Sequence, residues 1–246
     1  MAPEKRKEIK ILSIDGGGIR GVIPAMFLAS VEEKLNGKNI YEYFDIICGT
    51  NAGVIVALSA SAGIKMNLLI ELYKENRKEI FRKGFLRKIK NIFCHNSLYN
   101  SKVLYEKLAN IFEDKKISDL KTKILIPSSI VNTRQTKILK TPHTVVYPNK
   151  ETFFADKEYM LRDVALATSA APFFFTPHKI ENYYYWDGGL WANNPTICGL
   201  IEAKRLDKDV KVKILSLGTG YYKLNVLNRS LECFSRIKTL FNPKFD

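Results

Sequence analysis

The sequence predicts a single α/β domain built on a mostly parallel β-sheet with helices on both faces. Two observations carry this prediction: short apolar segments alternate with amphipathic ones along the chain, and glycine-rich turns follow several of the apolar segments. The chain has 246 residues, 46% of them hydrophobic and 26% charged, so it can bury a large core. This composition excludes a disordered chain, and we expect residues 1–246 to form one domain.

The first half of the chain gives the clearest strand and helix signals. Residues 9–14 form an apolar run of strand length, and three glycines end it. Residues 22–35 have apolar side chains at helical spacing and predict a helix. Residues 44–48 predict a second strand, which leads through a glycine-bracketed turn into a helix of small residues at 52–61. Residues 66–80 are amphipathic and predict another helix.

The second half continues the alternation of strands and helices. We expect helices over residues 101–112, 161–168 and 196–206, and strands over residues 123–126, 144–147, 183–186 and 212–217. Alternation of this kind is typical of a parallel sheet, because each helix crosses a face of the sheet before the next strand.

The net charge, the first ten residues and the cysteines indicate the partner and the compartment of the protein. Lys and Arg number 39 against 25 Asp and Glu, a net charge of +14, which indicates an anionic partner or else a basic bias spread over solvated faces. No apolar run reaches about 18 residues, so we expect no membrane-spanning helix. Residues 1–10 are charged, so we expect no secretory signal and a cytoplasmic location with peripheral membrane association. Four isolated cysteines match no zinc spacing and fit a reducing compartment.

A basic segment runs from Arg82 to Phe93. It holds five Lys and Arg with no acid, interleaved with Phe, Leu and Ile. Such a segment can dock on an anionic membrane surface, or it can be a helix whose apolar side chains pack on the core while its lysines are solvated. Nucleic acid is not expected as a partner, because no nucleic-acid-binding motif accompanies the charge.

A glycine-rich turn, Gly16, Gly17 and Gly18 followed by Arg20, comes directly after the first strand. Backbone N–H groups of successive glycines can point into one concavity and bind an anion or a developing oxyanion. Residues 16–21 also satisfy the G-x-G-x-x-G pattern of dinucleotide sites, but Asp45, the acid that the pattern requires, precedes the second strand instead of ending it. The simplest alternative is that the glycines only permit a tight turn.

The turn after the second strand has the context of a nucleophile elbow. Gly49 and Gly53 bracket it, but the central residue is Asn51 where the G-x-S-x-G pattern has serine. An amide has no usable nucleophilic oxygen, although asparagine tolerates the positive φ that an elbow requires. Ser59 and Ser61 lie two to three turns along the following helix, without flanking glycines, and we do not expect either to replace the nucleophile.

One carboxylate stands out among the remaining titratable residues. Asp187 ends a strand and precedes two glycines, so it can serve as a general base or be an ordinary Asp-Gly turn. His95, His143 and His178 lie in polar, loop-like surroundings, and we expect all three to be surface residues outside any catalytic triad.

Five motifs, in order, resemble the patatin-like phospholipases: DGGGIRG at 15–21, GTNAG at 49–53, ATSAAPFFF at 167–175, DGG at 187–189 with NNP at 193–195, and LSLGTG at 215–220. The resemblance extends over about residues 9–222. It implies a three-layer α/β/α sandwich and hydrolysis of acyl esters in phospholipids and related lipids, with no metal or organic cofactor.

The resemblance also assigns roles to residues. It implies a Ser–Asp dyad with Asp187 as the base, an oxyanion loop formed by the glycines at 16–18 with Arg20, and Asn51 at the position of the nucleophilic serine. Asn51 therefore predicts an inactive chain, whether the replacement was introduced or arose naturally. A natural pseudoenzyme that binds lipid or a protein partner through an intact pocket is the alternative.

Overall fold

The computed structural model describes residues 8–36, 38–80, 101–143 and 156–220. The helices are α1 (Val22–Lys34), α2 (Ile40–Tyr43), α3 (Ala52–Ala62), α4 (Met66–Ile80), α6 (Ser101–Phe112), α8 (Leu161–Ser169), α9 (Gly189–Ala192) and α10 (Thr196–Leu206), with short 3₁₀ turns at Gly18–Gly21, Ile117–Asp119 and Asp156–Glu158. The strands are β1 (Glu8–Ile14), β2 (Ile46–Gly49), β3 (Lys123–Ile130), β4 (Gln135–Lys140), β5 (His178–Ile180), β6 (Tyr183–Asp187) and β7 (Lys211–Leu217).

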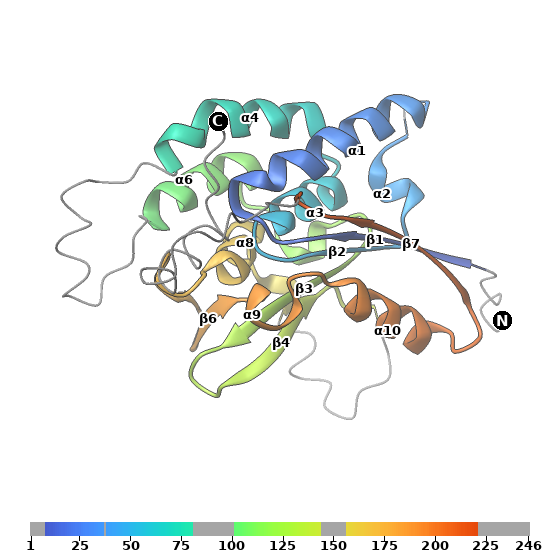
Figure 1. Cartoon of the computed structure of the whole chain (residues 1–246). Coiled ribbons are helices and arrows are strands. Elements are labelled where there is room, and N and C mark those ends of the chain that lie inside the picture. The colour runs from blue at the N-terminus through green and yellow to red at the C-terminus, as the bar shows by residue number, and fades with distance from the viewer. Residues whose placement is uncertain (1–7, 37, 81–100, 144–155, 221–246) are drawn as a thin grey trace, which may run out of the picture.

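These elements form three layers, as predicted, with the sheet in the middle (Figure 1). Helices α1, α3, α4, α6 and α8 cover one face, and α10 covers the other (Figure 1). Side chains alternate along β1 accordingly: Leu12 and Ile14 belong to the large core under α3, whereas Ile9 and Ile11 belong to a smaller core that includes Ala203 of α10. Helix α3 lies in the large core, where every residue from 52 to 61 is buried.

The sheet is mixed, with a parallel centre. Strands β7, β1, β2 and β3 are neighbours in that order and all run parallel, which confirms the predicted parallel arrangement. Strands β4 and β6 both pair antiparallel with β3, and β5 pairs antiparallel with β6. Neither β4 nor β5 was expected, because β4 begins with exposed polar residues and β5 has only three residues. The strand expected over residues 144–147 lies outside the described residues.

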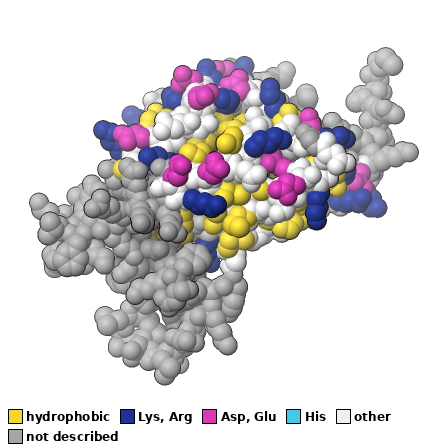
Figure 2. All heavy atoms as spheres, turned by 90° about the horizontal axis from the view of Figure 1, so that it is seen from above, with side chains coloured by type: hydrophobic (Ala, Val, Ile, Leu, Met, Phe, Trp, Pro, Cys, Tyr) yellow, Lys and Arg dark blue, Asp and Glu magenta, His cyan; other side chains and the backbone are white. Residues whose placement is uncertain are grey.

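Charges of both signs cover the face formed by α1 and α4, with hydrophobic side chains between them (Figure 2). Met26 and Phe27 on α1 and Leu68 on α4 are among the exposed large hydrophobic residues. Most of the excess of Lys and Arg over acids, including the segment from Arg82 to Phe93, lies outside the described residues. The predicted membrane-docking segment therefore stays a prediction from the sequence.

Candidate active site

The candidate site forms where β2 and β6 end against each other on one edge of β3. Strand β2 pairs with residues 123–125 of β3, and β6 pairs antiparallel with residues 128–130 along the same strand. Because β2 and β6 run in opposite directions, their C-terminal ends meet. This topology brings the turn after β2 next to Asp187, the last residue of β6.

Asn51 occupies the tip of the turn after β2, with a φ of 52° and a ψ of −129°. The positive φ matches the strained backbone predicted for an elbow. A Cβ on Gly53 would lie 2.6 Å from the carbonyl oxygen of Ile14, and a Cβ on Gly49 would lie 2.6 Å from Cβ of Ala57. Both positions therefore require glycine for the helix and the first strand to pack so closely.

The side-chain oxygen of Asn51 accepts hydrogen bonds from two backbone N–H groups. Oδ1 lies 2.6 Å from the nitrogen of Ala52 and 3.2 Å from that of Gly18. The N–H after an elbow residue and an N–H from a neighbouring loop are the usual pair of donors in an oxyanion hole. The donors in the glycine-rich loop were predicted from the sequence, but Ala52 was not, although it directly follows the elbow residue.

Asp187 is the hydrogen-bond partner of Asn51 on the other side. The Asn51 amide Nδ2 donates to Oδ2 of Asp187, and the Gly189 N–H donates to Oδ1 at 2.7 Å. Asp187 is only 2% exposed. Burial disfavours its charged form and raises the pKa of Asp187 to about 7, although the hydrogen bonds from Gly189 and Asn51 oppose the rise. A carboxyl group with this pKa can accept and return a proton near neutrality.

The glycine-rich loop is held by its neighbours, and its predicted members differ in what they offer the site. The Gly16 N–H donates to the carbonyl of Asn193 at 3.0 Å, so it is not available to an oxyanion. Arg20 donates to the carbonyl oxygens of Gly17 at 3.4 Å and Gly220 at 3.3 Å and so ties the loop to the chain after β7. Gly18, with a φ of 58°, is the loop residue whose N–H reaches Asn51.

Residues within the motifs at 167–175 and 193–195 also support the site. Thr168 accepts a hydrogen bond from the Asn51 N–H at 3.3 Å, and the Asp187 N–H donates to the Ala170 carbonyl at 3.1 Å. Asn194 donates to Asp15 at 2.8 Å, which links the segment after α9 to the end of β1. The bonds of Thr168 to Asn51 and of Asn194 to Asp15 join residues more than 100 positions apart, so spacing alone could not reveal them.

The expectation of a surface histidine is wrong for His143, whereas His178 is half-buried beside an acidic residue. Nε2 of His178 lies 2.8 Å from Asp163 Oδ1. The His143 side chain is 7% exposed, and its Nε2 lies 3.1 Å from Oε1 of Glu202, a carboxylate that Lys140 also contacts at 2.7 Å. The fold buries His143 because α10 packs over the sheet beside the end of β4. Neither histidine is among the hydrogen-bond partners of Asn51 or Asp187, and His95 lies outside the described residues.

Other predicted features have simple structural places. Asp45 precedes β2 and accepts the Lys10 N–H at 2.9 Å, which puts it at the opposite end of β2 from the glycine-rich loop. Cys48 is buried and Cys198 half-buried, both as free thiols. Within the described ranges, no group of three or more His, Cys, Asp or Glu could hold a metal ion. In the same part of the chain no helix is long and apolar enough to cross a membrane.

Comparisons with known proteins identify the family. Residues 12–197 match the family described as patatin-like phospholipase. The chain is 35% identical over 236 residues to the cGAMP-activated phospholipase of Vibrio cholerae, covering 87% of this chain and 65% of that protein. It is 31% identical over 251 residues to calcium-independent phospholipase A2-gamma of Rattus norvegicus, covering 96% of this chain and 31% of that protein. Patatin-like protein 2 of Oryza sativa is 31% identical over 229 residues, covering 83% of this chain and 55% of that protein.

The chain spans just under two thirds of the length of the Vibrio cholerae protein and less of the other two. Among solved structures, VipD from Legionella pneumophila matches 75% of this chain and 46% of its own with a TM-score of 0.46 and 12% identity. The family match covers all three elements of the site: the glycine-rich loop, the elbow and Asp187. This chain belongs to the patatin-like phospholipase family.

Proposed function

We propose that this site is that of a lipid acyl hydrolase of the Ser–Asp dyad type, in which Asn51 replaces the nucleophile and leaves the chain inactive. One observation carries the proposal: the elbow side chain touches both groups that an attacking serine would need. It contacts the carboxylate of Asp187, and it lies within hydrogen-bond distance of the N–H groups of Ala52 and Gly18.

A serine at position 51 would complete the chemistry. Asp187 would take the hydroxyl proton as Oγ attacks the ester carbonyl and would return it to the leaving alcohol. The N–H groups of Gly18 and Ala52 would hold the oxyanion, each contributing about 3 kcal/mol in comparable sites. Water activated by Asp187 would then release the fatty acid from the acyl-enzyme.

Lipid is the substrate class that the surroundings favour. Ile23, Met26 and Phe27 are exposed on the first two turns of α1, directly after the glycine-rich loop, and Leu190 and Trp191 are exposed on α9, directly after Asp187. Apolar side chains on both sides of the site suit contact with a lipid aggregate. The names of the relatives, which are phospholipases, support the same class.

A second candidate function is a pseudoenzyme that binds lipid or a protein partner without cleaving it. The hydrogen bonding of Asn51 favours it, because the amide oxygen accepts two bonds while the amide nitrogen donates to Asp187. Because both ends of the Asn51 amide are hydrogen-bonded, the residue fits a site that binds a ligand without cleaving it. Lipid binding by the unaltered chain, measured without turnover, would support this candidate.

The decisive experiment compares ester and phospholipid hydrolysis by the chain, by Asn51→Ser and by Asn51→Gly. Asn51→Gly is the matched control because glycine accepts a φ of 52° and frees both backbone donors without supplying a nucleophile. We expect turnover from Asn51→Ser alone, since losing such a nucleophile costs roughly a million-fold in kcat in a comparable hydrolase. A serine-directed phosphonate should label that variant only. Equal rates for all three proteins would overturn the assignment of position 51.

A further inference from the structure

The C-terminal turn of α8 contacts both halves of the proposed dyad. Thr168 is fully buried, and its Oγ1 accepts the Asn51 N–H at 3.3 Å. Two residues later the Ala170 carbonyl accepts the Asp187 N–H at 3.1 Å. One short segment therefore bonds to the backbone of the elbow residue and to the backbone of the proposed base.

Thr168 also connects the elbow to the strand on which Asp187 is registered. Its hydroxyl donates to the Pro127 carbonyl at 2.6 Å. The backbone of Gly188, next to Asp187, packs so closely on the same carbonyl that a Cβ there would collide with it. Asp187 itself pairs with Ser128, the next residue of β3. The Pro127 carbonyl thus contacts both Thr168, which binds the elbow, and Gly188, which follows Asp187.

We propose that Thr168 is a positioning residue that sets the separation between the side chain at position 51 and Asp187, a role that rests on the proposed function of the site. Among the described strands, β2 and β6 pair with β3 and not with each other. Their pairing with β3 sets the register of both strands, and the fine separation of the two side chains beyond the strand ends then depends on links such as the one through Thr168. Without its hydroxyl the buried Asn51 N–H would lose its partner, and an elbow at positive φ persists only where its surroundings fix it.

The first test uses the Asn51→Ser background. Thr168→Val replaces the hydroxyl with a methyl group of similar size, and we expect kcat to fall at least about tenfold with KM unchanged, because small misplacements of reacting groups are costly. Thr168→Ser keeps the hydroxyl and should retain most of kcat. Thr168→Ala provides a second variant without the hydroxyl if the valine protein does not fold.

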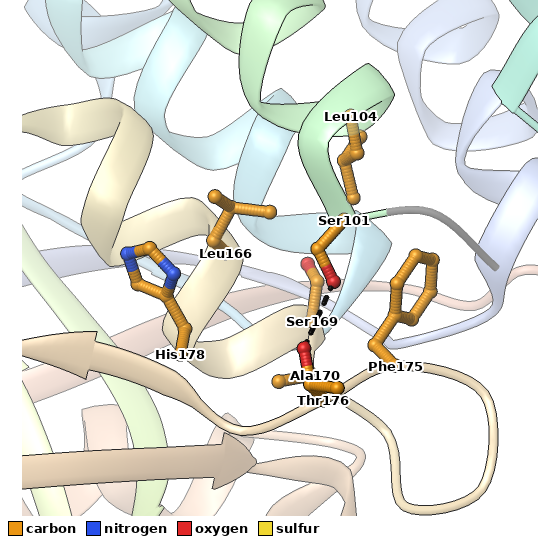
Figure 3. Close-up of a pocket in the computed structure, with 8 residues that line it drawn as sticks. All are labelled: Ser101, Leu104, Leu166, Ser169, Ala170, Phe175, Thr176 and His178. Carbon is orange, nitrogen blue, oxygen red and sulfur yellow. Dashed lines mark hydrogen bonds between the residues drawn. The ribbon is translucent and has the colours of Figure 1, made fainter. Parts of the chain in front are cut away.

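Two controls separate positioning from stability. Ser169 is the next residue, and its buried hydroxyl has no hydrogen-bond partner among the residues that the structure describes. It lines a small pocket between α6, α8 and the chain before β5 (Figure 3). Ser169→Ala should leave kcat unchanged. Thr122 donates to the carbonyls of Phe44 and Asp45 at the opposite end of β2, so Thr122→Val should lower stability but not kcat.

A second measurement needs no activity. In the unaltered chain the Asn51 amide donates to Asp187 and opposes the rise in its pKa. If Thr168 holds the elbow in place, Thr168→Val should weaken this bond and raise the pKa of Asp187. NMR titration of the carboxyl group measures that pKa. Thr122→Val should leave the pKa unchanged. An inactive Asn51→Ser would refute the proposed function while this titration still tests Thr168. An active Asn51→Ser whose kcat survives Thr168→Val, or an Asp187 pKa that does not rise in Thr168→Val, would overturn the role of Thr168 alone.

Discussion

Asn51 and Asp187, which are 136 residues apart in the sequence, are joined by a side-chain hydrogen bond in the interior of the protein. The contact exists because β2 and β6 occupy successive stretches of the same edge of β3 and run toward each other. The register of both strands on β3, fixed by backbone hydrogen bonds, thus brings the two residues of the proposed site together.

The pH dependence of the Asn51→Ser variant should report the carboxyl group of Asp187. The pKa of Asp187 is raised to about 7, and the base acts only when ionised, so kcat/KM should fall as pH drops below about 7. Asp187→Asn in the same background should abolish turnover with the fold retained, as circular dichroism would show. A variant that kept most of its activity would mean that another group supplies the base.

Asp187 should lower the stability of the unaltered chain at neutral and alkaline pH. Its pKa is raised above the ordinary value of 3.8, so the folded state binds the proton more tightly and the free energy of unfolding decreases as pH rises from about 4 to about 7. Asp187→Asn should therefore raise the free energy of unfolding at pH 8, by at most about 4 kcal/mol at 1.4 kcal/mol per pKa unit. Urea unfolding should show the difference vanish near pH 4. A difference independent of pH would contradict this assignment.

The buried pair of Lys140 and Glu202 should behave in the opposite way. Burial opposes ionisation of Glu202, but hydrogen bonds and charges from His143 and Lys140 outweigh it and lower the pKa of Glu202 to about 2. Its contribution to stability is present above the ordinary value of 4.5 and should be lost as pH falls from there toward 2.

Lys140→Met leaves the Glu202 carboxylate buried without its lysine partner, and should cost about 3–5 kcal/mol at pH 7. Lys140→Met combined with Glu202→Met removes both charges and should recover much of that loss. Denaturant unfolding of the two variants beside the unaltered chain measures both effects. A double variant no more stable than the single one would show that the pair is not coupled.

Gly188→Ala should destabilise the protein, because the new Cβ would collide with the backbone carbonyl of Pro127 and force β6 away from β3. We expect a loss of about 1–3 kcal/mol or more, measured by thermal unfolding. Gly218→Ala is the matched control: the nearest atom to its Cβ is Oδ2 of Asp15, at an ordinary 3.8 Å. Equal stability of the two variants would contradict the close approach.

The basic segment between Arg82 and Phe93 gives a prediction from sequence alone. Each Lys or Arg near an anionic membrane contributes about 1 kcal/mol to the binding free energy, and salt screens this contribution. Phenylalanines that enter the membrane interface add a contribution that salt does not screen. Replacing Arg87, Lys88 and Lys90 with Ala should therefore remove most of the salt-dependent binding to anionic vesicles and leave binding to neutral vesicles nearly unchanged. Co-sedimentation across a salt series tests this, and undiminished binding would exclude the segment as a docking surface.

Most of the fold and the residues of the candidate site could be predicted from the sequence because local signals encode them. The apolar run of β1, the glycines around Asn51 and the Asp-Gly turn at Asp187 each appear within a few residues. The antiparallel strand β4 has no such signal, since its first residues are polar and exposed.

The hydrogen-bond partners of two residues could not be predicted, for a different reason. Thr168 lies inside one of the recognised motifs and His143 was expected at the surface, but their partners, Asn51 and Glu202, could not be predicted because they lie far away in the sequence. Hydrogen bonds of this kind depend on the final packing of the chain and leave no periodic trace in the sequence. The elbow pattern itself indicates Ala52, because the residue after the nucleophile position donates its backbone N–H whatever its side chain.

The burial of α3 on every side determines which parts of the site can move. A helix whose residues from 52 to 61 all pack inside the core cannot shift without disrupting that core. The elbow at its N-terminus is therefore held in place. The opposite wall is different: no residue of α9 is buried, and Arg20 holds the glycine-rich loop through long hydrogen bonds near the surface. Among the described residues around the site, we therefore expect α9 to move more easily than the elbow.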